Sequence, residues 1–129
     1  MSQYNFTLTG KIIPCVRMTT RSKFGDPRAH AYLISQMDLR MQLKNQMALN
    51  DWPMLPEGTP LTVVLEIGTD KLRNGDPDNI SKLDNIFEAV ADAANKIVFP
   101  DDRWIDKLSV WRYPANENKA ALIVWAVDG

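Results

Sequence analysis

The sequence predicts an α+β fold in which two helices pack on a four-stranded mixed sheet, within a single domain spanning residues 1–129. Three observations favour this fold. The chain is 45% apolar and 24% charged, a composition typical of one globular domain with one core. Two long stretches repeat their apolar residues with a helical period, and four short stretches are β-branched or alternate apolar with polar residues. Along the chain these stretches follow the order β-α-β-α-β-β.

The first strand is expected over residues 4–10, where Tyr4, Phe6 and Leu8 alternate with polar residues. A continuation through Ile12 and Ile13 fits the same apolar character. Residues 17–28 are polar and basic, which favours a loop.

The first helix is expected over residues 27–49. Asp26 is a suitable N-cap, Pro27 suits the first turn, and the chain has no further glycine or proline up to Asn50. Several apolar side chains share one helical face: Ile34, Met37, Met41 and Ala48, with Tyr32 and Leu33 at its edge. Prolines and a glycine between Pro53 and Pro60 then mark a loop.

The second half contains the other strands and the second helix. Residues 61–67 are apolar and β-branched, which predicts a strand. From Asp78 onward, apolar residues recur at intervals of three and four and predict a helix: Ile80, Leu83, Phe87, Val90, Ala94 and Ile97. This helix is expected to end before Phe99-Pro100. Two last strands are predicted at 108–111 and 121–125.

The sequence also predicts the compartment. The longest apolar run, from Ala120 to Val127, is far shorter than the roughly 20 residues that cross a bilayer. The first residues lack the basic-then-apolar layout of a secretory signal. The single cysteine, Cys15, cannot form an internal disulfide. We therefore expect a cytoplasmic protein with no membrane partner.

Charge is distributed unevenly along the chain. Residues 1–50 carry seven basic and two acidic side chains, a net charge of +5, whereas residues 51–129 carry eight basic and fourteen acidic side chains, a net charge of −6. This asymmetry is compatible with an ordinary solvated surface. It is equally compatible with a polyanion-binding surface beside a carboxylate site. In the second case the basic loop is expected to contact nucleic-acid phosphates through Arg17, Arg21, Lys23 and Arg28.

Most catalytic signatures are absent from the sequence. It contains no phosphate-binding glycine loop, no His-Glu-x-x-His and no paired Cys-x-x-Cys. One histidine, His30, and one cysteine give little support to a Ser-His or Cys-His nucleophile. We expect ordinary surface or packing roles for both, and core or strand positions for the four tryptophans.

The acidic residues offer a different chemistry. Asp76 and Asp78 lie two residues apart before the second helix, Lys82 follows one helical turn later, and Asp102 comes after that helix. Mg²⁺ prefers oxygen ligands and often uses only one or two carboxylates together with substrate phosphates. A metal held there would polarise a phosphodiester and activate water, and Lys82 would offset phosphate charge. The spacing alone favours a simpler interpretation, with Asp78 as an N-cap and the other acids in solvated turns.

These residues resemble the RusA-type Holliday junction resolvases. The family pattern is Gly-Asp-x-Asp-Asn-x-x-Lys, then Asp-Ala within a helix, then Asp-Asp followed by an aliphatic residue. The chain has Gly75-Asp76-Pro77-Asp78-Asn79-Ile80-Ser81-Lys82, then Asp92-Ala93, then Asp101-Asp102 and Ile105. Arg17-Met18-Thr19, Asp26-Pro27-Arg28-Ala29 and Tyr32 resemble the family's arginine-rich loop and first helix.

The resemblance implies a homodimeric endonuclease that nicks four-way DNA junctions symmetrically, with Mg²⁺, for which Mn²⁺ is a possible substitute, and no organic cofactor. By the same resemblance, Asp76, Asp78 and Asp102 are the essential metal-binding carboxylates and Lys82 is the catalytic lysine. The segment from Lys82 to Asp102 is several residues longer than in many relatives.

A second alignment starts at Asp84-Asn85 and runs through Glu88 and Asp92 to Asp102. In this register Lys82 replaces the first catalytic aspartate and Glu88 replaces the lysine, so the acid-x-acid pair is lost. An active enzyme is therefore expected to use the Asp76 register, in which Leu83 and Phe87 face inward while Asp84 and Glu88 face out. The alternatives are a catalytically inactive junction- or DNA-binding homologue, or a dimeric interaction module that binds no nucleic acid.

Overall fold

The computed structural model describes residues 3–14, 27–70 and 83–127. The elements in these ranges are β1 (Gln3–Thr9), α2 (Pro27–Leu49), β2 (Leu61–Thr69), α4 (Leu83–Ala94), the short 3₁₀ helix η1 (Asp102–Trp104), β3 (Ile105–Pro114) and β4 (Lys119–Ala126). The predicted α+β class and the predicted order of elements are confirmed.

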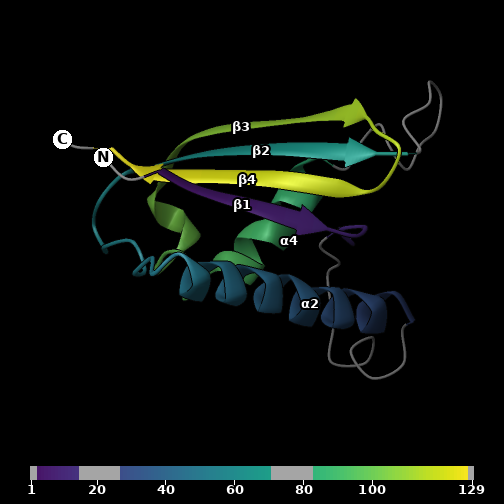
Figure 1. Cartoon of the computed structure of the whole chain (residues 1–129), viewed down its shortest axis with the longest axis horizontal. Coiled ribbons are helices and arrows are strands. Elements are labelled where there is room, and N and C mark those ends of the chain that lie inside the picture. Colours follow the sequence, from purple (N-terminus) through teal and green to yellow (C-terminus); the bar gives the residue numbers. More distant parts are fainter. Residues whose placement is uncertain (1–2, 15–26, 71–82, 128–129) are drawn as a thin grey trace.

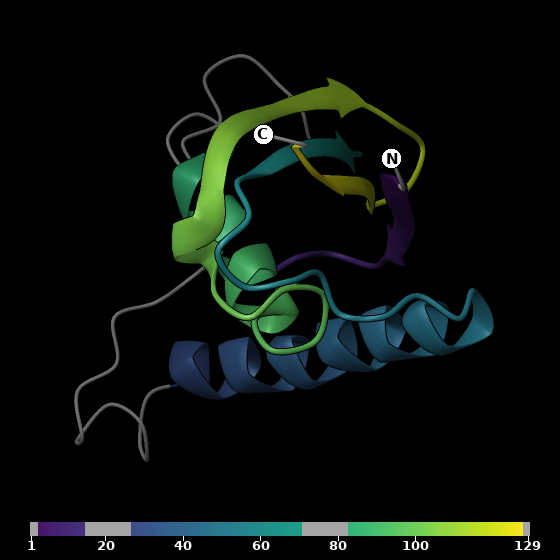
Figure 2. The same ribbon diagram turned by 90° about the vertical axis from the view of Figure 1, so that its left-hand side faces the viewer.

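The four strands form one mixed sheet in the order β1-β4-β2-β3 (Figure 1). β4 pairs antiparallel with both β1 and β2, whereas β2 and β3 are parallel. Parallel neighbours need a crossover connection, and α4 lies in the one between β2 and β3. Both helices lie on the same side of the sheet, as Figure 1 and Figure 2 show.

The hydrophobic core lies between the sheet and the two helices. β1 alternates exposed and buried residues along its whole length, as its sequence period predicts. Phe6, Leu65 and Leu122 from three neighbouring strands are at most 1% exposed. They belong to one buried cluster with Leu43 of α2 and Val90 of α4. This cluster fixes both helices against the sheet.

The buried face of α2 is not the apolar stripe that predicted the helix. The core side of α2 contains Tyr32, Gln36, Leu39, Leu43 and Met47. The stripe instead faces solvent. Its largest side chains are exposed by 36% to 70%, and we call them the α2 stripe: Leu33, Ile34, Met37 and Met41. Helix α2 therefore carries apolar residues on two different faces.

Glutamine side chains explain this orientation of α2. Gln46 accepts a hydrogen bond from the backbone N–H of Thr7 (2.9 Å) and donates one to the Thr7 carbonyl (2.8 Å). Gln42 makes the same pair of bonds with Thr9, at 2.9 and 3.1 Å. Because β1 is an edge strand, these amides satisfy backbone groups that have no strand partner. A residue type expected in solvent thus faces the sheet, and the α2 stripe is turned outward.

The loop after α2 is held by aromatic packing and backbone hydrogen bonds. The Tyr4 ring stacks on Trp52 with 4.7 Å between ring centroids, and its hydroxyl donates to the Pro53 carbonyl at 2.7 Å. Further on, the Leu55 N–H donates to the Val98 carbonyl at 2.8 Å. The loop therefore braces the segment that connects α4 to η1.

Within the described ranges, no helix is both long enough and apolar enough to cross a membrane.

Candidate active site

Of the residues predicted to form the active site, the structure describes Asp102. Three of the predicted residues, Asp76, Asp78 and Lys82, lie outside the described residues. The same holds for the predicted DNA contacts Arg17, Arg21 and Lys23. Helix α2 begins at Pro27 as predicted, and Arg28 belongs to its first turn. The side chain of Arg28 lies outside the part of the structure that is described.

Asp102 is the first residue of η1, at the turn between α4 and β3. The preceding residue, Asp101, is an extended N-cap whose carboxylate accepts the backbone N–H of Arg103 at 3.0 Å. The Ile105 N–H donates to the Asp102 carbonyl and closes the turn. Val98 and Phe99, which are at most 1% exposed, anchor the chain just before it. A buried anchor and a cap thus fix the half-buried side chain of Asp102.

Burial and neighbouring acids raise the pKa of Asp102 above its ordinary value of 3.8. Desolvation is the largest cause, followed by the hydrogen bond with Asp101 and by repulsion from Asp101 and Asp92, while a hydrogen bond with Asn95 acts in the opposite direction. The pKa of Asp101 is lowered, first by the Arg103 backbone N–H and then by the hydrogen bond with Asp102. Asp101 therefore stays ionised while Asp102 holds a proton more readily.

The end of α4 supplies the groups around Asp102. Asp92 accepts a hydrogen bond from the Tyr32 hydroxyl of α2 at 2.9 Å. Asn95 hydrogen-bonds to Asp102, and its buried Oδ1 atom has no hydrogen-bond partner. Two helices that are distant in sequence thus contribute polar groups to one acidic region.

A groove of about 620 Å³ lies between α4 and the start of β3 and opens beside Asp102. Its apolar floor includes Leu83, Phe87 and Val110, all half-buried. Four acidic side chains line it: Asp84, Glu88, Asp102 and Asp106. Leu83 and Phe87 face inward while Asp84 and Glu88 are exposed, as the helical pattern predicts. The groove therefore brings together Asp102 and the two acids of the second alignment.

Asp102 has the chemistry of a ligand for a hard divalent cation, because it is a fixed carboxylate whose charge is opposed by other acids. Within residues 3–14, 27–70 and 83–127, however, no three acidic, histidine or cysteine side chains converge closely enough to hold a metal. A complete site at Asp102 would thus need further ligands. Asp76 and Asp78 are the candidates that the sequence offers.

Sequence reasoning did not assign site roles to Tyr32, Asp92 and Asn95. Tyr32 and Asp92 belong to the quoted motifs, and Asn95 lies within the span of the second alignment, but their meeting depends on the packing of α2 against α4. Tyr32 and Asp92 are 60 positions apart, and a pattern of neighbouring residues cannot predict a contact over that distance in the sequence.

Comparison with known families identifies one match. The model of the endodeoxyribonuclease RusA family matches residues 19–124, which is most of the chain. No curated protein matches the chain.

Proposed function

The chain belongs to the RusA endodeoxyribonuclease family, a family of Holliday junction nucleases, and we propose that it resolves four-way DNA junctions by paired symmetric nicks in a magnesium-dependent reaction. We propose a cytoplasmic role in recombination and repair, with branched DNA as the partner. The family match carries this proposal, because it extends over the basic first helix and the acidic second half alike.

The structure supports a phosphodiester-cleaving role for the region around Asp102. Mg²⁺ bound there would polarise a phosphate and lower the pKa of a bound water. The ligands we propose are Asp76, Asp78 and Asp102. The turn that begins η1 orients Asp102 through the Asp101 cap, and Asn95 donates to its carboxylate. The cap fixes the backbone at Asp102 and the Asn95 contact orients its carboxylate, which suits a ligand of defined geometry.

Lys82 and the basic loop complete the proposed machinery. We assign Lys82 to the stabilisation of negative charge that develops on the phosphate during hydrolysis. Arg17, Arg21, Lys23 and Arg28 bind phosphates and position the junction without reading bases. This division explains why one half of the chain is basic and the other acidic.

The proposed active form is a homodimer, since paired nicks on opposing strands require two sites related by a two-fold axis. Ile34 and Met41 of the α2 stripe are the surface we propose for the second copy. They are 55% and 61% exposed and lie two helical turns apart, so they form an apolar centre for an isologous contact. Asp38, which is exposed, borders them and provides a polar rim.

A second candidate function is supported by the groove beside α4. Asp84, Glu88 and Asp102, which the second alignment matches to the family's site, line one groove in the structure. In that register Glu88 stands where the family has its lysine. The protein would then be a junction-binding homologue without nuclease activity.

The deciding experiment uses a synthetic four-way junction and a linear duplex of matched sequence, each incubated with the protein with and without Mg²⁺. The proposal predicts symmetric nicking of the junction with Mg²⁺, binding without cleavage in its absence, and little action on the duplex. Tight junction binding with no cleavage in Mg²⁺ or Mn²⁺ would favour the inactive homologue. No binding to either DNA would contradict both.

A further inference from the structure

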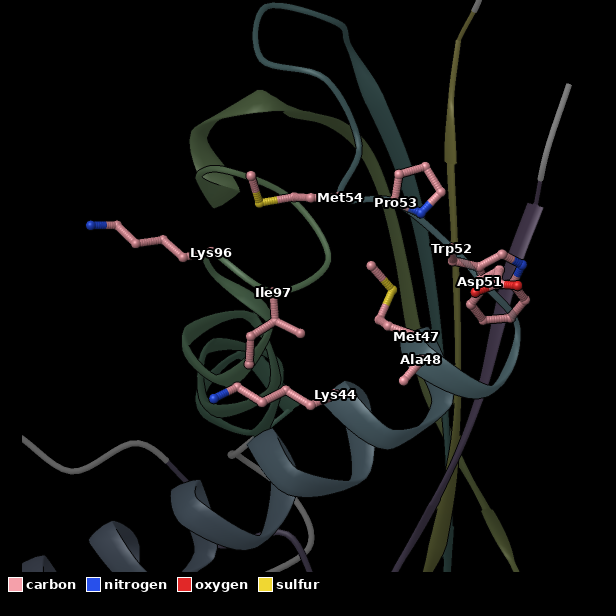
Figure 3. Close-up of a pocket in the computed structure, with 9 residues that line it drawn as sticks. All are labelled: Lys44, Met47, Ala48, Asp51, Trp52, Pro53, Met54, Lys96 and Ile97. Atoms are coloured by element: carbon pink, nitrogen blue, oxygen red, sulfur yellow. The ribbon is translucent and has the colours of Figure 1, made fainter.

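Two adjoining depressions follow α2 on the side where the turn after α4 packs. The larger, of about 840 Å³, is lined by Arg40, Lys44 and Lys96 among others. The smaller, of about 530 Å³, continues past Lys44 and Lys96 towards Trp52. Figure 3 shows the smaller one, with the Lys44 and Lys96 side chains extending towards the same side. Together they form one furrow, which we call the α2 furrow.

The α2 furrow has an excess of positive charge. Arg40 and Lys44 lie one helical turn apart on α2, about 6 Å along its axis, and Lys96 faces them from the other wall. All three are exposed. Among the residues that the structure describes, none of the three forms an ion pair. The acids in the furrow are Asp92, which the Tyr32 hydroxyl already binds, and Asp51 at the far end.

The turn after α4 holds the backbone of Lys96 in a conformation that is uncommon for a lysine. Its φ angle is +67°, in the left-handed region where glycine is favoured after a helix. Its N–H donates to the Phe99 carbonyl at 2.6 Å, so the tight turn fixes this conformation. A lysine at such a position is strained, as is Asp51 with a φ of +52°, so both are positions where glycine would fit more easily. Glycine would adopt this φ without strain, but it would not provide the ammonium group of lysine.

The α2 furrow also leads to the acidic region. Asn95, next to Lys96, lines the furrow and hydrogen-bonds to Asp102. A strand bound along the furrow would therefore end beside the proposed nuclease site.

We propose that Arg40, Lys44 and Lys96 bind phosphates of one DNA arm and direct its backbone towards Asp102. This inference rests on the proposed function, and it assigns a second phosphate-binding surface besides the basic loop. The three cations are spread over α2 and the turn after α4, which suits contacts along a phosphate backbone and not base reading.

The test uses two glycine variants that make the same backbone change at two positions. Lys96→Gly and Asp51→Gly both relieve a positive φ, which is +52° at Asp51, and both residues line the furrow. Each variant is expected to unfold a few degrees higher than the wild type. Lys96→Gly should weaken four-way junction binding about tenfold at ~0.1 M salt and reduce the slope of log K against log salt by about 0.9. Asp51→Gly should bind at least as tightly as the wild type.

Lys44→Gln and Arg40→Gln provide the second measurement, because neither changes a strained backbone angle. Each is expected to lower the salt slope by about 0.9 as well, without a loss of helix content. Wild-type affinity and slope in all three cation variants would overturn the furrow assignment while leaving the proposed nuclease intact. A wild type that binds no junction would overturn both.

Discussion

Replacing Asp102 with Asn is expected to stabilise the protein at neutral pH while abolishing junction cleavage. The ionised carboxylate is half-buried and repelled by Asp101 and Asp92. Asparagine has the same shape, and its amide can still donate to Asp101 and accept from Asn95. Charge pairs at partly exposed positions are worth about 0.2–1 kcal/mol each. Removing two such repulsions should therefore add about 1 kcal/mol, or roughly 3 °C in the melting temperature of a domain of this size.

The gain in stability should depend on pH in a defined direction. Because folding raises the pKa of Asp102 above 3.8, the wild type is relatively more stable below that value and loses this contribution as pH rises through the folded pKa. The asparagine side chain of the variant does not titrate. The difference between Asp102→Asn and the wild type should thus be largest near pH 7 and vanish at acidic pH.

Thermal unfolding in EDTA, from pH 3 to pH 7, measures this difference directly. In a parallel series, Mg²⁺ at ten times its dissociation constant should stabilise the wild type by about 1.4 kcal/mol and stabilise Asp102→Asn less. A variant that is less stable than the wild type at pH 7, or equally stabilised by Mg²⁺, would refute the electrostatic account of Asp102.

Three further results are expected. Gln46→Ala removes both hydrogen bonds to the β1 edge and should lower the free energy of unfolding in urea by about 1–2 kcal/mol. The exposed neighbour Asn45 gives a matched control, because Asn45→Ala should leave the free energy of unfolding unchanged. Alanine at Arg17 and Arg21 together should weaken junction binding and flatten its salt dependence, and an unchanged salt slope would exclude that segment from the phosphate contacts. Met41→Glu places a charge in the α2 stripe and should convert a dimer to a folded monomer in sedimentation; persistence of the dimer would place the interface elsewhere.

Local pattern located the helices and strands along the chain, but not all of their ends. The helix over 27–49 and the strand from Leu61 follow from Asp26-Pro27, uninterrupted helix formers and a β-branched run, and the structure has both elements at those positions. The last strands extend to Ile105–Pro114 and Lys119–Ala126, beyond the predicted 108–111 and 121–125. Pairing with β2 extends these strands past their most β-prone residues.

Tertiary contacts decided what local pattern could not. The face that α2 buries depends on Gln42 and Gln46 meeting the edge of β1, and a polar side chain gives no sign of such a partner. The helix that was expected to include Ile97 ends at Ala94, because the chain turns at Lys96 with a positive φ. Helical periodicity continues through that turn in the sequence, so it cannot report the break.

From the sequence, the proposed active site could be predicted only as a set of carboxylates. Asp102 lies at the turn that its Asp-Asp motif indicates. Its raised pKa arises first from burial and then from its neighbour Asp101 and from Asp92, which the fold brings close. Asp76, Asp78 and Lys82 remain predictions, because they lie outside the described residues. The choice between the two registers is therefore a question for enzymology.

Junction cleavage by Asp76→Asn and Asp84→Asn, compared at equal concentration in Mg²⁺, tests the proposed active site most directly. Each change removes one charge and keeps the side-chain shape, so the two variants are matched. Asp76→Asn should lose nearly all cleavage while binding the junction as tightly as the wild type, and Asp84→Asn should cut at close to the wild-type rate. Full activity in Asp76→Asn, with loss of activity in Asp84→Asn, would contradict the assignment of Asp76, Asp78 and Lys82 to the catalytic centre.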